Sequence, residues 1–366
     1  MKNRVTMAQL SLLLMLVMMG GKFLSLPALL AAELGHDSWL AVAMSFLWDG
    51  VCLAFLMAAV RKNSLPIDKV LYGTLTPVGG RAVLAVFLVL FLCRIIVLLD
   101  SCYKTFAVTF DVNTSWILFV LPVMAVAAFA VHRGFNSVAR TAQLLFAPIV
   151  LSIIAILLYP ATQTQFRALA PVAEVGWKSI AEQAFLKSFW FSDFVFIYFV
   201  MDGIGKGRSA PVFVSFGVGA AITVLMNAVF VALFGSLAQH VDIAMSKIGL
   251  FAVSVSGVGR WDWLTFTVWL TSVILKIVVF TFCAYTCVEK ICGKAFGKVN
   301  PFAMAGITAA TLLPMFLSVT QLLDTFVRWC LVPFAVVQYV LPLFMPLLVR
   351  AANKKYPQPK EQYGKS

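Results

Sequence analysis

The stretch Met19-Gly20-Gly21-Lys22-Phe23 lies inside an apolar run that extends from Met7 to Ala32, with Pro27 shortly after the glycines. Two adjacent glycines weaken a helix, and a bilayer core offers no water to bond the backbone groups that a break would free. A lysine at this depth costs roughly 3 kcal/mol unless it is paired or hydrated. The stretch therefore predicts an interrupted membrane helix that lines a cavity or packs on protein.

The glycine pair also fits a second interpretation, in which small residues let two helices cross closely. Lys22 favours the functional interpretation over this one. The apolar residues between Lys22 and Ala32 separate its ammonium group from the outer end of the run, so the side chain cannot easily reach the membrane surface.

The composition of the whole chain agrees with a protein that crosses the membrane many times. Hydrophobic residues make up 62% and charged residues 12%, whereas soluble domains carry about 25% charged residues. Since a spanning helix needs about 20 mostly apolar residues, we predict an all-α polytopic membrane protein with about ten transmembrane helices. The predicted spans are Met7 to Ala32, Ser38 to Val60, Val83 to Val108, Trp116 to Val131, Val138 to Tyr159, Ala181 to Met201, Pro211 to Leu237, Trp261 to Val288, Phe302 to Val319 and Phe326 to Val349.

These spans form one predicted transmembrane domain, residues 1–350, followed by a short polar cytoplasmic tail, residues 351–366. Ten spans divide into two halves of five, at about 7–159 and 181–350. If the halves are inverted repeats, the first and sixth spans are equivalent. Interrupted helices at equivalent positions are the best sequence pointer to a transporter binding site.

The basic residues predict the orientation. If the N-terminus is cytoplasmic, the inner segments carry most of the lysines and arginines, whereas the outer segments carry few, which places both termini in the cytoplasm. The basic residues of the outer segments are Arg167, Lys178, Lys247, Arg260 and Arg328. The net charge of +13 thus reflects topology, and because no soluble basic face is available we predict no nucleic-acid partner.

The sequence gives no reason to expect an enzyme, a metal site or a cofactor. The three histidines, His36, His132 and His240, are far apart, and the seven cysteines lie mostly inside spans. An enzyme that works within the membrane finds little support, because the chain has no His-Glu-x-x-His run and no Gly-x-Ser-x-Gly elbow.

A polar and aromatic cluster in the sixth span, Lys187 to Asp193, corresponds to the glycine break of the first span. Exposed N–H groups at a half-helix N-terminus favour a carboxylate, and acids or freed carbonyls favour an ammonium group. A zwitterion such as an amino acid suits both, with aromatic side chains as apolar walls. The predicted ligand-binding residues are Gly20, Gly21, Lys22, Phe23, Trp190, Phe191, Ser192 and Asp193.

Four further ionisable residues within the predicted spans are candidates for charge relay or ion coupling: Asp49, Arg94, Asp100 and Lys276. Arg94 has no acid three or four residues away, so its partner must lie on another helix, in water or on a ligand. Asp100 and Lys104 are spaced i, i+4, which favours a local structural pair. Buried pairs of this kind can also serve fold specificity rather than transport.

Several motifs resemble one known family in their order along the chain. The first hairpin reads Gln9-Leu10, then Gly20-Gly21-Lys22, Leu26-Pro27 and His36-Asp37-Ser38-Trp39. It resembles the first hairpin of the spore germination permeases, the B-type subunits of bacterial germinant receptors. Further resemblances lie in the sixth span, at Phe189-Trp190-Phe191-Ser192-Asp193, and at the start of the eighth, at Gly259-Arg260-Trp261-Asp262 with Trp269. Ser192-Asp193 stands where Gly-Glu is usual in that family, and Lys22 stands in a break that is usually uncharged.

The resemblance implies the fold of the amino acid, polyamine and organocation transporter superfamily, with a leucine-transporter-like five-plus-five inverted repeat whose helices 1 and 6 are interrupted. It also implies a permease that senses a small nutrient in the bacterial cytoplasmic membrane, or the inner spore membrane, in a complex with A-type and C-type subunits. The alternative is a proton- or sodium-coupled carrier for amino acids or amines that is unrelated to germination.

Overall fold

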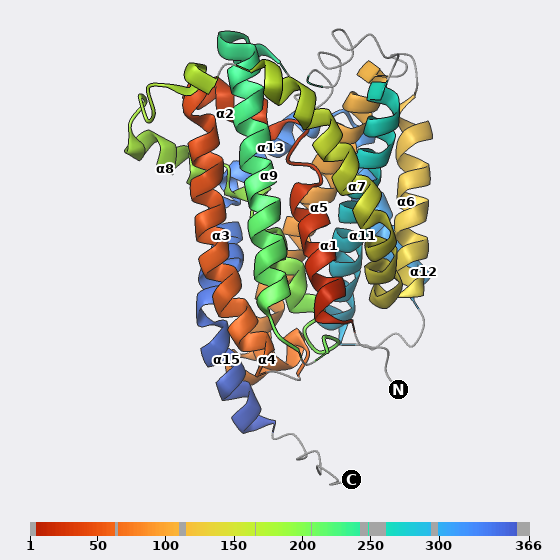
Figure 1. Cartoon of the computed structure of the whole chain (residues 1–366). Helices are drawn as coiled ribbons and strands as arrows, with labels where there is room; N and C mark the ends of the chain where they lie inside the picture. The colour runs from red at the N-terminus through yellow and green to blue at the C-terminus, as the bar shows by residue number, and fades with distance from the viewer. Residues whose placement is uncertain are drawn as a thin grey trace, which may run out of the picture.

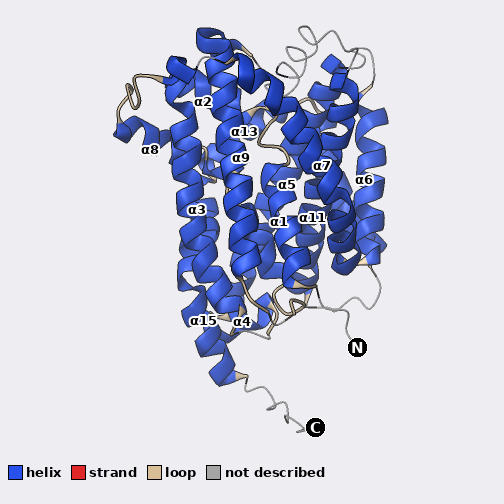
Figure 2. Ribbon diagram, viewed as in Figure 1, coloured by secondary structure: helices blue, strands red, loops and turns tan. Residues whose placement is uncertain are grey.

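The computed structural model describes residues 5–62, 65–109, 115–164, 166–205, 207–241, 248, 261–293 and 299–356. Within these ranges the chain forms helices and no β-strand (Figure 2). The all-α prediction is confirmed for this part of the chain.

The first half of the chain begins with two short helices in place of one long span. They are α1 (Met7–Met19) and α2 (Leu26–Leu34), and residues 20–25 separate them. A 3-10 turn, η1 (Gly35–Asp37), leads into the remaining helices of this half, which are α3 (Ser38–Val60), α4 (Ile67–Thr74), α5 (Pro77–Thr109), α6 (Trp116–Arg133) and α7 (Phe135–Gln163).

The second half also opens with short pieces, which occupy the predicted sixth span. After η2 (Phe166–Leu169) come α8 (Trp177–Leu186) and two 3-10 helices, η3 (Ser188–Trp190) and η4 (Asp193–Phe199). The elements that follow are α9 (Ala210–Phe234), η5 (Gly235–His240), α11 (Trp261–Cys292), α12 (Pro301–Phe316), α13 (Thr320–Trp329), α14 (Leu331–Ala335), the π-helix η6 (Val336–Val340) and α15 (Leu341–Lys355).

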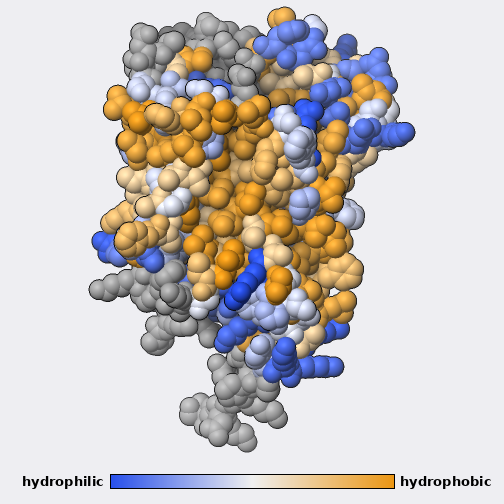
Figure 3. Space-filling view, turned by 180° about the vertical axis from the view of Figure 1, so that it is seen from behind, coloured by the Kyte–Doolittle hydropathy of each residue, from blue (hydrophilic) through white to orange (hydrophobic). Residues whose placement is uncertain are grey.

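Seven helical stretches of the described chain are long and apolar enough to cross a membrane. The predicted first and ninth spans contain shorter apolar helices, Met7–Met19 and Pro301–Phe316, and the predicted sixth span is assembled from α8, η3 and η4. The count of ten and the inverted repeat therefore stay predictions. Apolar side chains cover the middle of the face shown in Figure 3 and hydrophilic ones gather toward its two ends, as expected for a protein seated in a bilayer.

Helix α1 forms the centre of the bundle, and nearly all of its residues are buried. It packs against α7, α9 and α11, which explains why its sequence is apolar on every side. Two backbone hydrogen bonds tie its start to the segment after η4: Val5 N–H donates to Gly203 O at 3.0 Å, and Gly205 N–H donates to Val5 O at 2.9 Å. Segments 5–24 and 192–205 therefore run beside each other through the core.

Helix α1 begins and α15 ends at the same end of the bundle, the lower end in Figure 1; we call this the terminal end. Helices α2, α8 and α13 lie toward the opposite end. Helix α15 continues to Lys355, so the first residues of the predicted polar tail are helical, whereas residues 357–366 lie outside the described residues.

Candidate functional site

The first break shows both properties that the sequence suggested for Gly20 and Gly21, an interrupted helix and a close crossing of two helices. A Cβ atom on Gly20 would lie 2.9 Å from the backbone oxygen of Ser272 on α11, so glycine is needed for the close approach of the two chains. Gly21 has φ +87°, and a Cβ atom there would lie 2.4 Å from Leu98 Cδ2. The glycines thus end α1 and at the same time bring it against α11.

The second break is built without glycine. Ser192 takes the left-handed conformation, with φ 58° and ψ 38°, between η3 and η4. The Asp49 carboxylate on α3 holds it there, because Asp49 Oδ2 accepts from Ser192 N–H and Oδ1 accepts from Ser192 Oγ, both at 2.7 Å. In this structure Asp49, predicted as a relay or coupling residue, clamps the break.

Four buried ionisable side chains meet where the two breaks face each other. The Asp193 carboxylate accepts a hydrogen bond from Lys22 Nζ, receives Lys276 Nζ of α11 at 3.0 Å from each oxygen, and lies 3.5 Å from Arg94 Nη1 of α5. Lys22 Nζ also donates to Met18 O at 3.1 Å. One carboxylate therefore forms ion pairs with three cationic groups from three different segments.

Aromatic rings surround these cations. Lys22 Nζ lies 5.6 Å from the ring centroid of Phe46 and 5.4 Å from that of Phe191. Arg94 stacks against Phe189 and Phe280, and Lys276 Nζ lies 5.6 Å from the Phe280 centroid. A desolvated cation on a ring face gains up to about 2 kcal/mol. The rings thus offset part of the cost of burying these charges.

Arg94 is also positioned by the backbone oxygen of Phe191 and by the side chain of Gln338, which lies in the predicted tenth span. Its Nη2 donates to Phe191 O. In the amide orientation that satisfies its neighbours, Gln338 of the π-helix η6 accepts from Arg94 Nη2 at 3.2 Å and donates to Ser188 O at 3.1 Å. Single π-turns are frequent at functional sites, and here one brings a polar side chain to the second break.

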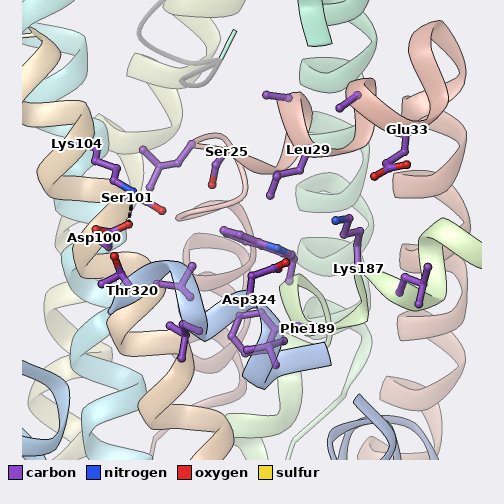
Figure 4. A pocket seen from close by; sticks show the side chains of 18 of the residues that line it. Ser25, Leu29, Glu33, Asp100, Ser101, Lys104, Lys187, Phe189, Thr320 and Asp324 are labelled. Atoms are coloured by element: carbon purple, nitrogen blue, oxygen red, sulfur yellow. Dashed lines mark ion pairs between the residues drawn. The ribbon is translucent and has the colours of Figure 1, made fainter. Parts of the chain in front are cut away.

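A cavity of about 920 Å³ is lined in part by α2, α8 and α13. These helices lie toward the end of the bundle opposite the terminal end (Figure 1), so the cavity lies on that side of the charge cluster. Figure 4 shows Asp100 and Lys104 of α5 on one side of this cavity and Glu33 and Lys187 on the other. Helix α13 contributes Asp324 and other residues to it. We call this space the vestibule.

A second, much smaller void of about 10 Å³ lies deeper. Phe189, Trp190 and Val97 line both spaces, whereas Arg94, Asp193 and Lys276 line only the deeper one. Side chains of η3 therefore stand between the vestibule and the charge cluster.

Gly20 and Gly21 form the first break, and the other six predicted ligand-binding residues fall into three groups. Lys22, Phe191, Ser192 and Asp193 belong to the cluster or contact it directly. Trp190 lines both cavities. Phe23 is fully buried in the apolar core and lines neither of these two cavities.

The other predicted charges are divided between the cluster and the vestibule. Arg94 and Lys276 join Asp193, so of the three kinds of partner left open for Arg94, which were another helix, water or a ligand, the structure shows a partner on another helical segment. Asp100 pairs with Lys104 at 2.7 Å, as its i, i+4 spacing indicates, and both side chains line the vestibule rather than the cluster. Gly259 and Arg260 of the eighth-span motif lie outside the described residues.

Sequence reasoning missed Gln338 and the walls of the vestibule, including Ser25 and Glu33 of the α2 region and Asp324 of α13. Gln338 carries a signal that could have been used, because it is a polar residue within an apolar span. Ser25, Glu33 and Asp324 look like ordinary helix-end residues in the sequence, and only the packing of α2 against α8 and of α13 against α5 brings them together.

The family model described as spore germination protein matches residues 4–321, nearly the whole chain. The chain belongs to the spore germination protein family. No curated protein sequence matches it. The predicted family is thereby confirmed, and the protein is an integral membrane protein of a permease family.

Solved structures with the same fold include the manganese transporter of Eremococcus coleocola. A histidine variant of that transporter is 11% identical, with a TM-score of 0.60, and the match covers 97% of this chain and 88% of the other. The complex of the transporter with an aromatic bis-isothiourea substituted compound is also 11% identical, with a TM-score of 0.53 and coverage of 94% and 76%. At this identity the likeness shows the fold alone.

Proposed function

We propose that this spore germination family protein binds a small nutrient, an amino acid, near the membrane midplane between segments 1 and 6, and acts in germinant sensing or transport. The observation that carries the proposal is that both helix breaks meet at one buried charge cluster directly beneath a large cavity. A volume of about 920 Å³ is ample for an amino acid and falls in the range of ordinary ligand sites.

The ends of two short helices provide the polarity that a zwitterion needs. Ser25 and Leu24, at the N-terminus of α2, line the vestibule, as do Gln183 and Leu186 at the C-terminus of α8. A helix N-terminus favours a carboxylate and a helix C-terminus favours an ammonium group. An amino acid that lies across the vestibule floor between α2 and α8 satisfies both preferences.

The charges of the cluster argue against a metal-ion substrate for this chain. A divalent cation at the breaks would meet three cationic side chains, Lys22, Arg94 and Lys276, and only one carboxylate that is not already bonded to Ser192. The described residues also contain no group of three or more histidine, cysteine or acidic side chains suited to a metal ion. The fold is shared with a manganese transporter, but we propose an amino acid rather than a metal ion as the ligand of this chain.

Two roles fit this site. As a germinant receptor subunit the protein would work with A-type and C-type subunits in the inner spore membrane, and the family match favours this role. As an amino acid or amine carrier driven by protons or sodium, it would act alone in the cytoplasmic membrane. Co-purification with A-type and C-type subunits supports the receptor, and concentrative uptake by the isolated chain in liposomes supports the carrier. In either role we place both termini in the cytoplasm, which accessibility labelling of single cysteines near each terminus tests.

Binding of radiolabelled amino acids to the purified full chain tests the proposed function. Because Lys22 joins the first break to Asp193 of the second, we expect Lys22→Met to weaken binding by about tenfold or more, equivalent to at least about 1.4 kcal/mol. Lys290→Met is the matched control, since Lys290 pairs with Asp68 outside the vestibule and the cluster. The absence of saturable binding of any amino acid to the wild-type protein would refute the function. If Lys22→Met binds amino acids as tightly as Lys290→Met and the wild-type protein do, Lys22 does not contribute to the site.

A further inference from the structure

The charge cluster carries more positive than negative charge. Among the described residues, the buried ionisable side chains at the breaks are Lys22, Arg94 and Lys276 against Asp49 and Asp193. Asp49 is engaged by both donors of Ser192, so the three cations share Asp193 alone. An uncompensated charge in a dry interior is strongly unfavourable, and the aromatic rings offset only part of this cost.

The geometry shows where the missing negative charge would fit. Lys22 bonds Asp193 and Met18 O and does not line the deeper void, whereas Arg94 and Lys276 both line it. Arg94 is 4% exposed, and its Nε has no hydrogen-bond partner among the described residues. A buried N–H of a charged group without a partner is costly, and it indicates that a further acceptor belongs in the site.

The size of the void limits the acceptor. A volume of about 10 Å³ corresponds to about one water-sized group. A halide ion is somewhat larger and needs a small displacement of Phe189 or Trp190, whereas a carboxylic acid or a phosphate needs a much larger one. Water would supply an acceptor but no charge. A single-atom anion supplies both, and the Phe280, Phe189 and Leu98 side chains also line the void.

We propose that Arg94 and Lys276 bind a monovalent anion of the size of chloride in the void behind Phe189 and Trp190. The anion accepts from the guanidinium and ammonium groups and lowers the excess charge of the cluster. It reaches the void from the vestibule, past the two aromatic side chains that line both spaces. This site is separate from the amino acid site proposed on the vestibule floor, and it exists whether or not an amino acid binds.

Thermal unfolding of the purified full chain in detergent micelles tests the anion site. The protein is prepared in sodium gluconate, whose anion is too large for the void, and chloride or bromide then replaces gluconate at constant ionic strength. We expect a saturable rise in the unfolding temperature, because an anion that binds only the folded state stabilises it. Sodium acetate is titrated in the same way, and a response to acetate that equals the response to chloride would show a general carboxylate site and overturn the halide assignment.

Two variants make the assignment specific. Lys276→Met removes one of the two ligands and part of the excess charge, so we expect the apparent halide affinity to fall by about tenfold or more. Lys290→Met, a change near the C-terminus of the same helix, is expected to keep the wild-type response to halide. Asp193→Asn removes the carboxylate that competes for the three cations, so this variant is expected to bind halide about tenfold more tightly than the wild-type protein does. A purely structural role for Lys276 predicts neither the loss nor the gain.

Three outcomes overturn the anion site: an unfolding temperature unaffected by halide, the same rise in Lys276→Met as in the wild-type protein, or weaker halide binding in Asp193→Asn. If Asp193→Asn does not fold, the comparison of wild-type protein with Lys276→Met still decides. Amino acid binding is measured separately in gluconate. Binding there together with a flat halide titration rejects the anion site and leaves the proposed function standing, whereas a halide response without amino acid binding does the reverse.

Discussion

The two helix breaks face each other across the charge cluster but are made by different means. In the first, Gly21 reaches φ +87° without a Cβ atom to oppose it, and Gly20 allows contact with the α11 backbone. In the second, Ser192 holds φ 58° although it has a side chain. Asp49, which lies far away in the sequence, supplies the two hydrogen bonds that stabilise it.

The difference shows that a membrane helix can be interrupted by local or by tertiary means. A glycine break costs little strain and forms from its own segment. A break held by a carboxylate from α3 depends on a partner, and it is lost if the partner is lost. The second break is therefore the more sensitive of the two, and mutations can rank them.

The largest effect is expected for Asp49→Ala. The change removes two hydrogen bonds to a charged acceptor and leaves Ser192 N–H and Oγ buried without it. At about 1.5–3 kcal/mol for each bond to a charged group, we expect a loss of about 3–6 kcal/mol in the free energy of unfolding. Thermal or denaturant unfolding in mixed micelles measures it.

Asp100→Ala is the control for Asp49→Ala, because Asp100 is an acid within a predicted span whose partner, Lys104, is largely exposed. Its pair contributes at most about 1 kcal/mol. If Asp49→Ala is no more destabilising than Asp100→Ala, the clamp does not hold the second break.

The sequence predicted the first break better than the second for a physical reason. Adjacent glycines and a following proline are local signals, and their effect on a helix does not depend on the rest of the chain. Nothing local in Phe191-Ser192-Asp193 requires a left-handed residue. The requirement comes from Asp49, and a single sequence does not show which distant side chain will face Ser192.

The same limit applies to the charges. Depth in the membrane indicated that Lys22, Arg94, Lys276 and Asp193 are costly unless they are paired, hydrated or bound to a ligand. The i, i+4 spacing of Asp100 and Lys104 predicted their pair. The sharing of one carboxylate by three cations follows only from the packing of α1, α5 and α11 around η4. Gln338 reaches Arg94 because it lies in a π-turn, and no local pattern in residues 336–340 indicates such a turn.

Gly21→Ala probes the first break and should have the second largest effect. The added methyl group meets Leu98 Cδ2 at 2.4 Å, and the positive φ is unfavourable for alanine. The conformational cost of about 1–2 kcal/mol and the overpacking cost of about 1–3 kcal/mol together predict a loss of about 2–5 kcal/mol in the free energy of unfolding.

Gly35→Ala separates these two costs. Gly35 also has a positive φ, +56°, but a Cβ atom there has no neighbour within 4 Å. With ψ −130° this is a conformation that residues other than glycine rarely adopt. We therefore expect only the conformational cost of about 1–3 kcal/mol. The double variant Gly21→Ala/Leu98→Ala should not restore the wild-type stability, because it removes the clash and keeps the strain. Equal losses in the Gly21 and Gly35 variants would mean that Leu98 moves aside freely.

The smallest effect distinguishes strain from bonding at the second break itself. Ser192→Gly and Ser192→Ala both remove the hydroxyl that Asp49 Oδ1 accepts from, and both keep the backbone N–H that bonds Oδ2. They differ only in the Cβ atom, which is unfavourable at φ 58°. The left-handed conformation costs a residue with a Cβ atom about 1–2 kcal/mol, and the greater unfolded-state entropy of glycine offsets about 0.4–1 kcal/mol of the gain. We therefore expect Ser192→Gly to be the more stable of the two by about 1 kcal/mol. Since the two variants lose the same hydrogen bond, their difference in unfolding free energy reports backbone strain once the entropy of glycine is subtracted. A Ser192→Gly variant that is less stable than Ser192→Ala would show that the clamp imposes no strain at Ser192, and the second break would then resemble the first in carrying little backbone strain.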